Sequence, residues 1–153
     1  MAQQVTLSEQ DWQVRLFIYQ FFVEQERPPT SEETSQKFGI PLEAAQSSYH
    51  RLNERHQIFL DPGTDSVRMA NPLSAVPTRY QLQINGRQLW ANCAWDALGI
   101  PAMLNADAEI EARDLFSNEP IHYQISDGKL ISQPYYIHFP LPVRHWYDDL
   151  IHT

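Results

Sequence analysis

Two prolines within seven residues divide this chain of 153 residues into halves of different character. Residues 71–77 read Asn-Pro-Leu-Ser-Ala-Val-Pro, and prolines at this density discourage both a helix and a central strand. Apolar residues recur at helical spacing before this segment and alternate with polar residues after it. We therefore expect an α+β chain with a helical module over residues 1–72 and a sheet-containing subdomain over residues 73–153.

The first half carries start and stop signals for three helices. Ser8 is the expected N-cap of the first helix, which should end before Pro28. Thr30 and Glu33 form a capping box that starts a second, short helix. Pro41 begins a third helix. The apolar face of this third helix is formed by Leu42, Ala45, Tyr49 and Leu52.

A turn-rich segment after the third helix predicts a small hairpin or wing. Residues 61–65, Asp-Pro-Gly-Thr-Asp, separate two short apolar runs. Three helices followed by a wing are typical of a winged helix-turn-helix. The third helix, however, offers only Arg51 and Arg55 as strong cations, and Glu43 and Glu54 oppose them. Because the whole chain has a formal net charge of -8, we favour a packing module that does not bind DNA.

Alternating residues in the second half predict a small mixed β-sheet. Residues 80–84 and 88–90 flank Asn85-Gly86, a strong signal for a two-residue hairpin turn. Further strands are expected at residues 108–112, 121–125, 129–131 and 136–139. The expected fold is thus an N-terminal three-helix, winged helix-turn-helix-like module packed on this mixed sheet and on the helix that follows its second strand.

The second strand leads directly into the one cysteine of the sequence, Cys93. A single cysteine excludes a disulfide within the chain, and a reducing compartment keeps its thiol available. We expect Asn92 to cap a helix that runs to about Leu104. Gly99 and Pro101 are expected to kink or divide this helix. Cys93 then lies in the first turn, where unpaired amides and the helix dipole lower the pKa of the thiol.

Asp96 follows Cys93 by three residues, so the two side chains share one helix face about one turn apart. A thiolate suits a thiophilic metal, and a carboxylic acid beside it can deliver or receive a proton. The alternative is that Cys93 is a small buried residue and that Asp96 only favours the helix N-terminus electrostatically. Spacing alone leaves both interpretations open. Trp90 and Trp95 flank the cysteine and either wall an apolar pocket or pack in the core.

Residues 89–104 resemble the active-site segment of the organomercurial (alkylmercury) lyase family. The resemblance includes the aromatic residue before the cysteine, the Cys-Ala-x-Asp core at residues 93–96 and the Pro-Ala-x-Leu exit at residues 101–104. In the order of its elements the resemblance extends over most of residues 8–112, and it is specific over about residues 89–112. It implies an α+β fold with a reactive cysteine at the start of a helix.

The family resemblance also implies roles for two residues. Cys93 would be the thiolate that captures mercury, and Asp96 the acid that protonates the carbon leaving the metal. Family members use a second cysteine further along the chain to share the mercury, and residues 94–153 contain none. The resemblance therefore indicates a diverged or C-terminally shortened member, in which a low-molecular-weight thiol replaces the missing ligand.

Three functions follow, in order of preference. The first is protonolytic cleavage of carbon–mercury bonds in an organomercurial, or action on another small thiophilic ligand, with no cofactor. The second is a non-catalytic homologue that binds a ligand or metal as a sensor or scaffold, and the third is a winged-helix transcription regulator. The sequence lacks both the roughly 18-residue apolar run of a membrane span and a signal peptide, so we expect a cytoplasmic protein without a membrane partner.

Overall fold

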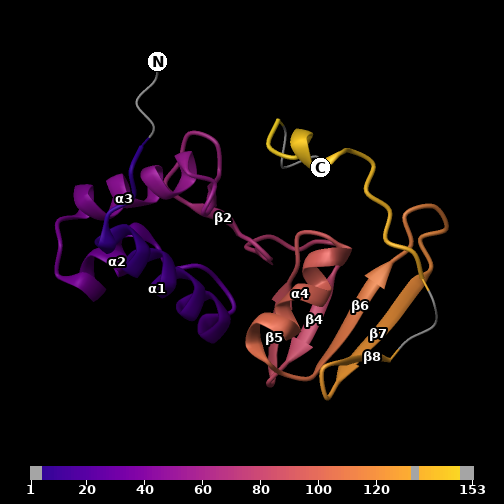
Figure 1. Cartoon of the computed structure of the whole chain (residues 1–153). Coiled ribbons are helices and arrows are strands. Elements are labelled where there is room, and N and C mark those ends of the chain that lie inside the picture. The colour runs from indigo at the N-terminus through magenta and orange to yellow at the C-terminus, as the bar shows by residue number, and fades with distance from the viewer. Residues whose placement is uncertain (1–4, 132–134, 149–153) are drawn as a thin grey trace.

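The N-terminal part of the chain folds into three helices. The structure, a computed structural model, describes residues 5–131 and 135–148. Helices α1 (Glu9–Gln25), α2 (Ser31–Phe38) and α3 (Leu42–Glu54) gather at one end of the molecule (Figure 1). The expected caps are confirmed, because the Ser8 and Thr30 side chains each accept the backbone N–H three residues on, in complete capping boxes.

A three-stranded antiparallel sheet follows the helices. Its order is β1 (Phe59–Leu60), β2 (Val67–Ala70), β3 (Leu73–Ser74). The turn-rich segment at residues 61–65 joins β1 and β2, as expected. Strand β3 lies within the proline-rich segment, and its Leu73 also forms a bridge to Ala91, beside the second sheet. The proline-rich segment is therefore hydrogen-bonded to both parts of the molecule.

The second half forms a five-stranded sheet with the order β5-β4-β6-β7-β8. The prediction of a mixed sheet was wrong, because every neighbouring pair in this sheet is antiparallel. Strands β5 and β6, which precede and follow helix α4, do run in the same direction, but β4 lies between them. The strands are β4 (Gln81–Ile84), β5 (Arg87–Trp90), β6 (Ala108–Arg113), β7 (Pro120–Ser126) and β8 (Lys129–Ile131).

Two sequence signals in this half had different outcomes. The Asn85-Gly86 hairpin is confirmed, since both residues have positive φ, 51° and 75°, and join β4 to β5. The strand expected at residues 136–139 was wrong, because these residues have no regular structure. Pro134 and Pro140 bound this short run in the sequence and remove backbone donors that a ladder would need. The only regular element after β8 in the described residues is the 3₁₀ turn η1 (Val143–His145).

Helix α4 (Ala94–Leu104) lies against one face of the five-stranded sheet (Figure 1). The helix was expected to be kinked or divided at Gly99 and Pro101. A division was wrong, because one helix passes through both residues. Pro101 lies close to the C-terminal end, and the helix ends at Asn105 in the left-handed conformation. No helix among the described residues is long and apolar enough to cross a membrane.

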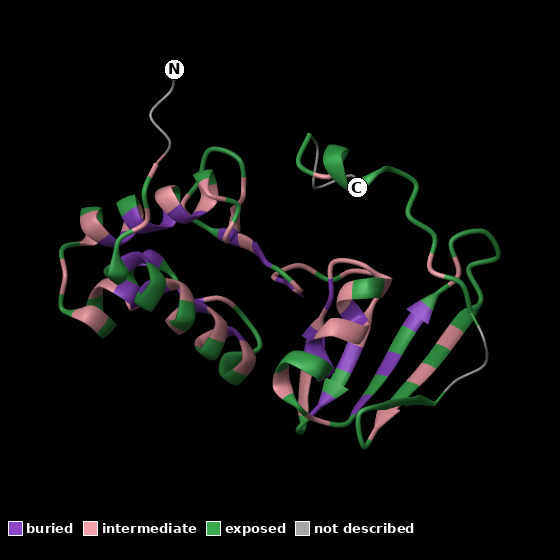
Figure 2. Cartoon of the chain, viewed as in Figure 1, coloured by how far each residue is buried: buried purple, intermediate pink, exposed green. Residues whose placement is uncertain are grey.

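One hydrophobic core joins the two parts. Figure 2 shows buried positions on the helices and on β4, β5 and β6, whereas β7 and β8 have no buried position. The cluster of buried residues takes members from α1, α3, both sheets and α4, and α1 also contacts β5. Its largest fully buried members are Tyr49, Phe22, Ile18, Leu52, Ile58 and Leu73. The helical part is therefore packed on the part that carries Cys93.

A buried carboxylate ties α1 to α3. The Asp11 side chain has no exposed surface and accepts hydrogen bonds from Ser8, Ser48 and Arg51, the last at 3.1 and 2.7 Å. Burial opposes the charge, but these bonds outweigh it and hold the pKa of Asp11 well below its usual value. Arg51, one of the two cations expected on the third helix, is thus committed to an internal ion pair.

We expect Asp11→Asn to lower the free energy of unfolding at pH 7 by about 2 kcal/mol, since it leaves charged donors without their partner. Because the folded pKa lies below the ordinary value of 3.8, the contribution is complete above that pH and is lost as the pH falls further. The difference from the unsubstituted protein should therefore shrink at pH 3. Urea unfolding at both pH values measures this, with exposed Glu9→Gln as the control. Equal effects of the two substitutions at pH 7 would contradict it.

Candidate functional site

The first turn of α4 brings Cys93 and Asp96 together. Cys93 is itself the N-cap residue, and its Sγ accepts the backbone N–H of Asp96 at 3.5 Å. The prediction that Asn92 caps this helix was wrong. The Asn92 side chain instead donates to the Asn71 side chain at 2.9 Å. The Cys93 sulfur therefore lies at the start of the helix, where the backbone N–H of Asp96 is directed at it.

The prediction of a lowered thiol pKa was also wrong. Burial of Cys93 raises its pKa above the ordinary value of 9.0, and the nearby Asp96 carboxylate raises it further. Backbone hydrogen bonds from Asp96 and Trp95 favour the thiolate, but they are outweighed. In the free protein at neutral pH the sulfur therefore keeps its proton. A soft metal that binds sulfur would have to displace that proton.

The pKa of Asp96 is also raised above its ordinary value. Partial burial raises the pKa of its carboxyl group, whereas hydrogen bonds from the side chains of Cys93 and Asn92 lower it by less. The carboxyl group holds its proton more firmly than an exposed aspartate does. A thiol and an acid that both resist ionisation thus lie one helical turn apart, which suits a site that must supply protons.

Hydrogen bonds from outside α4 reach this site. The Tyr19 hydroxyl on α1 donates to the Asn71 carbonyl oxygen at 2.7 Å, and Asn71 in turn accepts the Asn92 side chain. The Asp96 charge also contributes to the raised pKa of Tyr19, after the larger effect of burial. The sequence did not predict Tyr19 and Asn71 as neighbours of the site. No local pattern marks them, because their proximity to it arises from tertiary packing.

The two flanking tryptophans lie differently. Trp90 is partly buried on β5, whereas the Trp95 side chain is 61% exposed. The Trp95 and Phe139 rings pack edge to face, with the ring centroids 6.4 Å apart. That Trp90 and Trp95 wall a substrate pocket stays a prediction.

A cavity of about 450 Å³ lies between α1 and the C-terminal end of α4. Apolar side chains from both helices line it, and Tyr19 and Asn71 border it as well. The cavity therefore shares Tyr19 and Asn71 with the hydrogen bonds that lead from α1 to Asn92. Its apolar lining is formed by Leu16, Val23, Met103 and Leu104.

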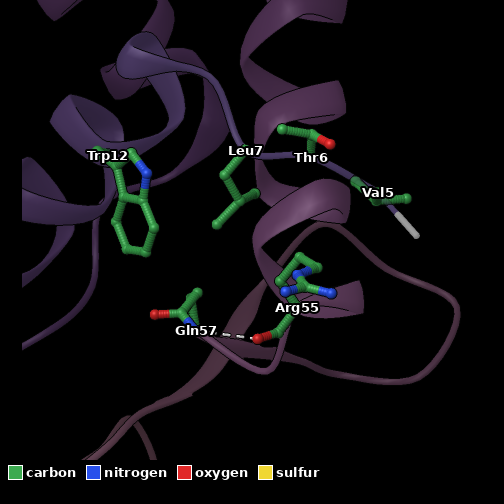
Figure 3. Close-up of a pocket in the computed structure, with 6 residues that line it drawn as sticks. All are labelled: Val5, Thr6, Leu7, Trp12, Arg55 and Gln57. Atoms are coloured by element: carbon green, nitrogen blue, oxygen red, sulfur yellow. Dashed lines mark hydrogen bonds between the residues drawn. The ribbon is translucent and has the colours of Figure 1, made fainter.

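A second hollow, of about 220 Å³, lies beside the N-terminal segment (Figure 3). Leu7 and Trp12 border it, with Arg55 and Gln57, and the Gln57 amide donates to the Arg55 carbonyl oxygen at 3.0 Å. Its lining includes no thiol, carboxylate or imidazole. This hollow therefore lacks the groups for metal or acid–base chemistry that the α4 site has.

Within residues 5–131 and 135–148, no cluster of three or more His, Cys, Asp or Glu side chains is arranged to hold a metal ion. Cys93 and Asp96 are thus two neighbouring groups and do not form a complete set of metal ligands. A thiophilic metal at Cys93 would have to complete its coordination with Asp96 or with a ligand from solution.

Comparisons with known proteins agree on one family. The sequence model of the alkylmercury lyase family matches residues 73–150, which are 78 of the 153 residues. Two curated proteins named alkylmercury lyase, from Bacillus cereus and Clostridium butyricum, are each 32% identical over 60 residues. These 60 residues cover 39% of this chain and only 28% of each relative.

A solved structure extends the likeness to the helical part. The crystal structure of the mercury-bound form of MerB2 superimposes with a TM-score of 0.65 and 26% sequence identity, over 83% of this chain. The match covers 61% of that chain, so the present sequence spans less than two thirds of it. The likeness supports the α+β fold.

We expect Asp96→Asn to increase the rate at which iodoacetamide alkylates Cys93 at pH 8. The substitution removes a negative charge that helps to raise the thiol pKa, so a larger fraction of the sulfur is thiolate. A pH series of the alkylation rate measures the thiol pKa in both proteins. Glu109→Gln, on the exposed polar face of β6, removes the same charge at a distance and should leave the rate unchanged. A thiol pKa that does not fall in Asp96→Asn would contradict the assigned electrostatics.

Proposed function

Since this chain belongs to the alkylmercury lyase family, we propose that it cleaves carbon–mercury bonds by protonolysis at Cys93 and Asp96. The observation that carries the proposal is the contact between Cys93 Sγ and Asp96 at the start of α4, inside the segment that the family model matches. The mercury-bound state of MerB2 supports mercury as the metal that such a site receives.

Cys93 acts first, as the ligand that captures the organomercurial. Its thiol exchanges with the ligand already on mercury, so that a sulfur–mercury bond forms and the displaced ligand leaves with the thiol proton. Burial raises the pKa of the Cys93 thiol, but the thiol still loses its proton readily when a soft metal binds the sulfur. Electron density from the bound thiolate makes the carbon on mercury more basic. The carbon is then prepared to accept a proton.

Asp96 acts second, as the proton donor. Its raised pKa favours the protonated carboxyl group, and its place one turn from the sulfur is suited to reach a carbon carried by mercury on Cys93. The proton passes to carbon, the mercury–carbon bond breaks, and the hydrocarbon leaves. Hg(II) stays on the Cys93 thiolate, and Asp96 is left as a carboxylate.

Two molecules of a low-molecular-weight thiol complete the cycle. Residues 94–153 contain no second cysteine to share the mercury, so the first external thiol supplies the second sulfur ligand and its proton restores Asp96. The second thiol displaces Cys93 from mercury, its proton returns to the Cys93 sulfur, and Hg(II) leaves with two external thiolates. This requirement places the protein in a reducing compartment such as the cytoplasm.

We assign separate roles to the two parts of the chain. Residues 1–72 form a winged-helix-like packing module, and residues 73–153 form the lyase-like subdomain. Three helices followed by β1, β2 and β3 support the first assignment. The ion pair between Arg51 and Asp11 removes one of the few cations available to contact nucleic acid, which disfavours a DNA-binding regulator.

The organic group of the substrate would lie against the apolar surfaces beside α4. Trp90 and Trp95 are the aromatic side chains next to Cys93 in sequence, and Trp95 offers exposed ring surface. The cavity between α1 and α4 offers aliphatic side chains, and the hydrogen-bonded pair Tyr19 and Asn71 also lines it. Both surfaces suit small alkyl or aryl groups.

Incubation with phenylmercury and excess thiol should release benzene, which gas chromatography of the headspace detects. Cys93→Ser should abolish the release, because a hydroxyl group is a poor ligand for mercury. Benzene at or below the level of this control would refute the lyase function. One-to-one mercury retention without benzene would instead favour a sensor or scaffold that only binds the metal.

Asp96→Asn should separate capture from chemistry. The amide cannot donate a carboxylic proton, so benzene release should fall by at least about 100-fold, whereas the sulfur still binds phenylmercury. Single-turnover benzene release together with mercury analysis of the desalted protein measures both steps. Glu109→Gln serves as the matched control for loss of a carboxylate far from the site. Release that is unaffected in Asp96→Asn would remove this residue from the mechanism.

A further inference from the structure

A partly buried arginine without an acidic partner borders the cavity between α1 and α4. The Arg15 guanidinium donates to the Tyr19 hydroxyl at 3.3 Å, and its central carbon lies 4.6 Å from the centroid of the Tyr19 ring and 6.0 Å from that of Trp12. These two rings hold the guanidinium beside the cavity. Within the described part of the chain, no carboxylate pairs with Arg15, and its buried Nε atom has no hydrogen-bond partner.

The missing partner sets Arg15 apart from three other arginines. Arg27, Arg51 and Arg68 each have a carboxylate oxygen within 3.0 Å of a guanidinium nitrogen. Carboxylates are plentiful in this chain, whose formal net charge is -8, and buried charges are normally paired. The Arg15 guanidinium therefore keeps a positive charge and N–H donors that an anion from solution can satisfy.

The remainder of the cavity suits the apolar body of a ligand. Leu16 of α1 and Met103 of α4 both line it, and 58% of Leu16 and 42% of Met103 is exposed. A ligand that covers these side chains removes apolar surface from water, which favours binding. The volume of about 450 Å³ lies in the range of cavities that hold small organic molecules.

Glu24 gives the cavity a direction. It lines the same cavity but follows Arg15 by nine residues on α1, which corresponds to a rise of about 13 Å along the helix. An anionic group is attracted at the Arg15 end and repelled at the Glu24 end. The acidic group of a ligand is therefore favoured at Arg15, and its apolar body extends from there along α1.

We propose that this cavity binds a small monocarboxylate with an apolar body, whose carboxylate Arg15 holds. A carboxylate suits a guanidinium because its two oxygens can accept parallel hydrogen bonds from the guanidinium fork. Neither Cys93 nor Asp96 lines this cavity. The inference goes beyond the proposed lyase function, which calls only for an apolar group in this region, and it does not depend on that function.

Isothermal titration calorimetry of the full chain with hexanoate, hexanamide and acetate tests the proposal. Hexanoate should bind at least about 10-fold more tightly than hexanamide, because the amide lacks the charge that Arg15 attracts. It should also bind at least about 10-fold more tightly than acetate, because acetate lacks the methylene groups that the cavity covers. Equal affinities for hexanoate and hexanamide, or no binding of hexanoate at millimolar concentration, would overturn the proposal.

Arg15→Gln should remove the preference for hexanoate over hexanamide and leave the affinity for hexanamide unchanged. Arg55→Gln is the matched control, because Arg55 borders the separate hollow beside Trp12 and Leu7 (Figure 3). This control removes the same charge and should leave both affinities unchanged. Loss of the preference in Arg55→Gln, with the preference kept in Arg15→Gln, would assign the carboxylate to the other hollow and overturn the proposal.

Methionine methyl signals locate the ligand in the unsubstituted protein, so this measurement also decides the question if Arg15→Gln does not fold. Met103 lines the cavity, whereas Met69 is buried on β2. With isotope-labelled methionine methyl groups, hexanoate should shift the Met103 signal, assigned by its loss in Met103→Leu, and leave the Met69 signal in place. Binding without a shift of the Met103 signal would overturn the proposal.

The outcomes of these measurements are independent of the lyase assay. The titrations contain neither mercury nor thiol, so a failure of hexanoate to bind leaves carbon–mercury cleavage untouched. Absence of benzene from the unsubstituted protein would refute the lyase function and leave the carboxylate site untouched. The two failures are thus distinguishable.

Discussion

Residues 71–73 are the point at which the two parts of the molecule are joined by hydrogen bonds. Asn71 accepts the Tyr19 hydroxyl, Pro72 accepts the Asn92 N–H, and Leu73 pairs with β2 and bridges Ala91. A segment rich in proline has few donors of its own, so it serves here mainly as a row of carbonyl acceptors. Because these acceptors bind both α1 and the residues just before Cys93, the position of the reactive turn depends on both parts.

The chemistry of the site follows from burial more than from the helix dipole. A helix N-terminus favours thiolate, yet Cys93 is partly buried beside a carboxyl group, and both effects favour the thiol. Such a sulfur is a poor nucleophile toward ordinary electrophiles, but mercury binds sulfur strongly enough to displace the proton. The arrangement therefore favours a thiophilic metal over other reagents. Burial raises the pKa of the Asp96 carboxyl group as well.

The sequence predicted local structure well and tertiary relations poorly. Ser8 and Thr30 were recognised as caps because capping boxes are local, and Asn85-Gly86 because a hairpin turn needs two residues with positive φ. The position of β4 between β5 and β6 has no local signal, so the sheet was wrongly expected to be mixed. The direction of the Cys93 pKa shift was missed for a similar reason, since burial is set by residues distant in sequence.

Hydrogen bonds through Asn71 and Asn92 connect the helical part to the residues just before Cys93. If this part only covered the core, a hydrocarbon contact between α1 and β5 would suffice, and no polar bond from Tyr19 would be needed. A hydrogen bond adds direction, because it fixes the Asn71 carbonyl and, through Asn71, the Asn92 amide. Helix α1 is itself anchored by the Asp11–Arg51 ion pair. The position of the residues just before Cys93 therefore depends on the packing of both parts of the molecule.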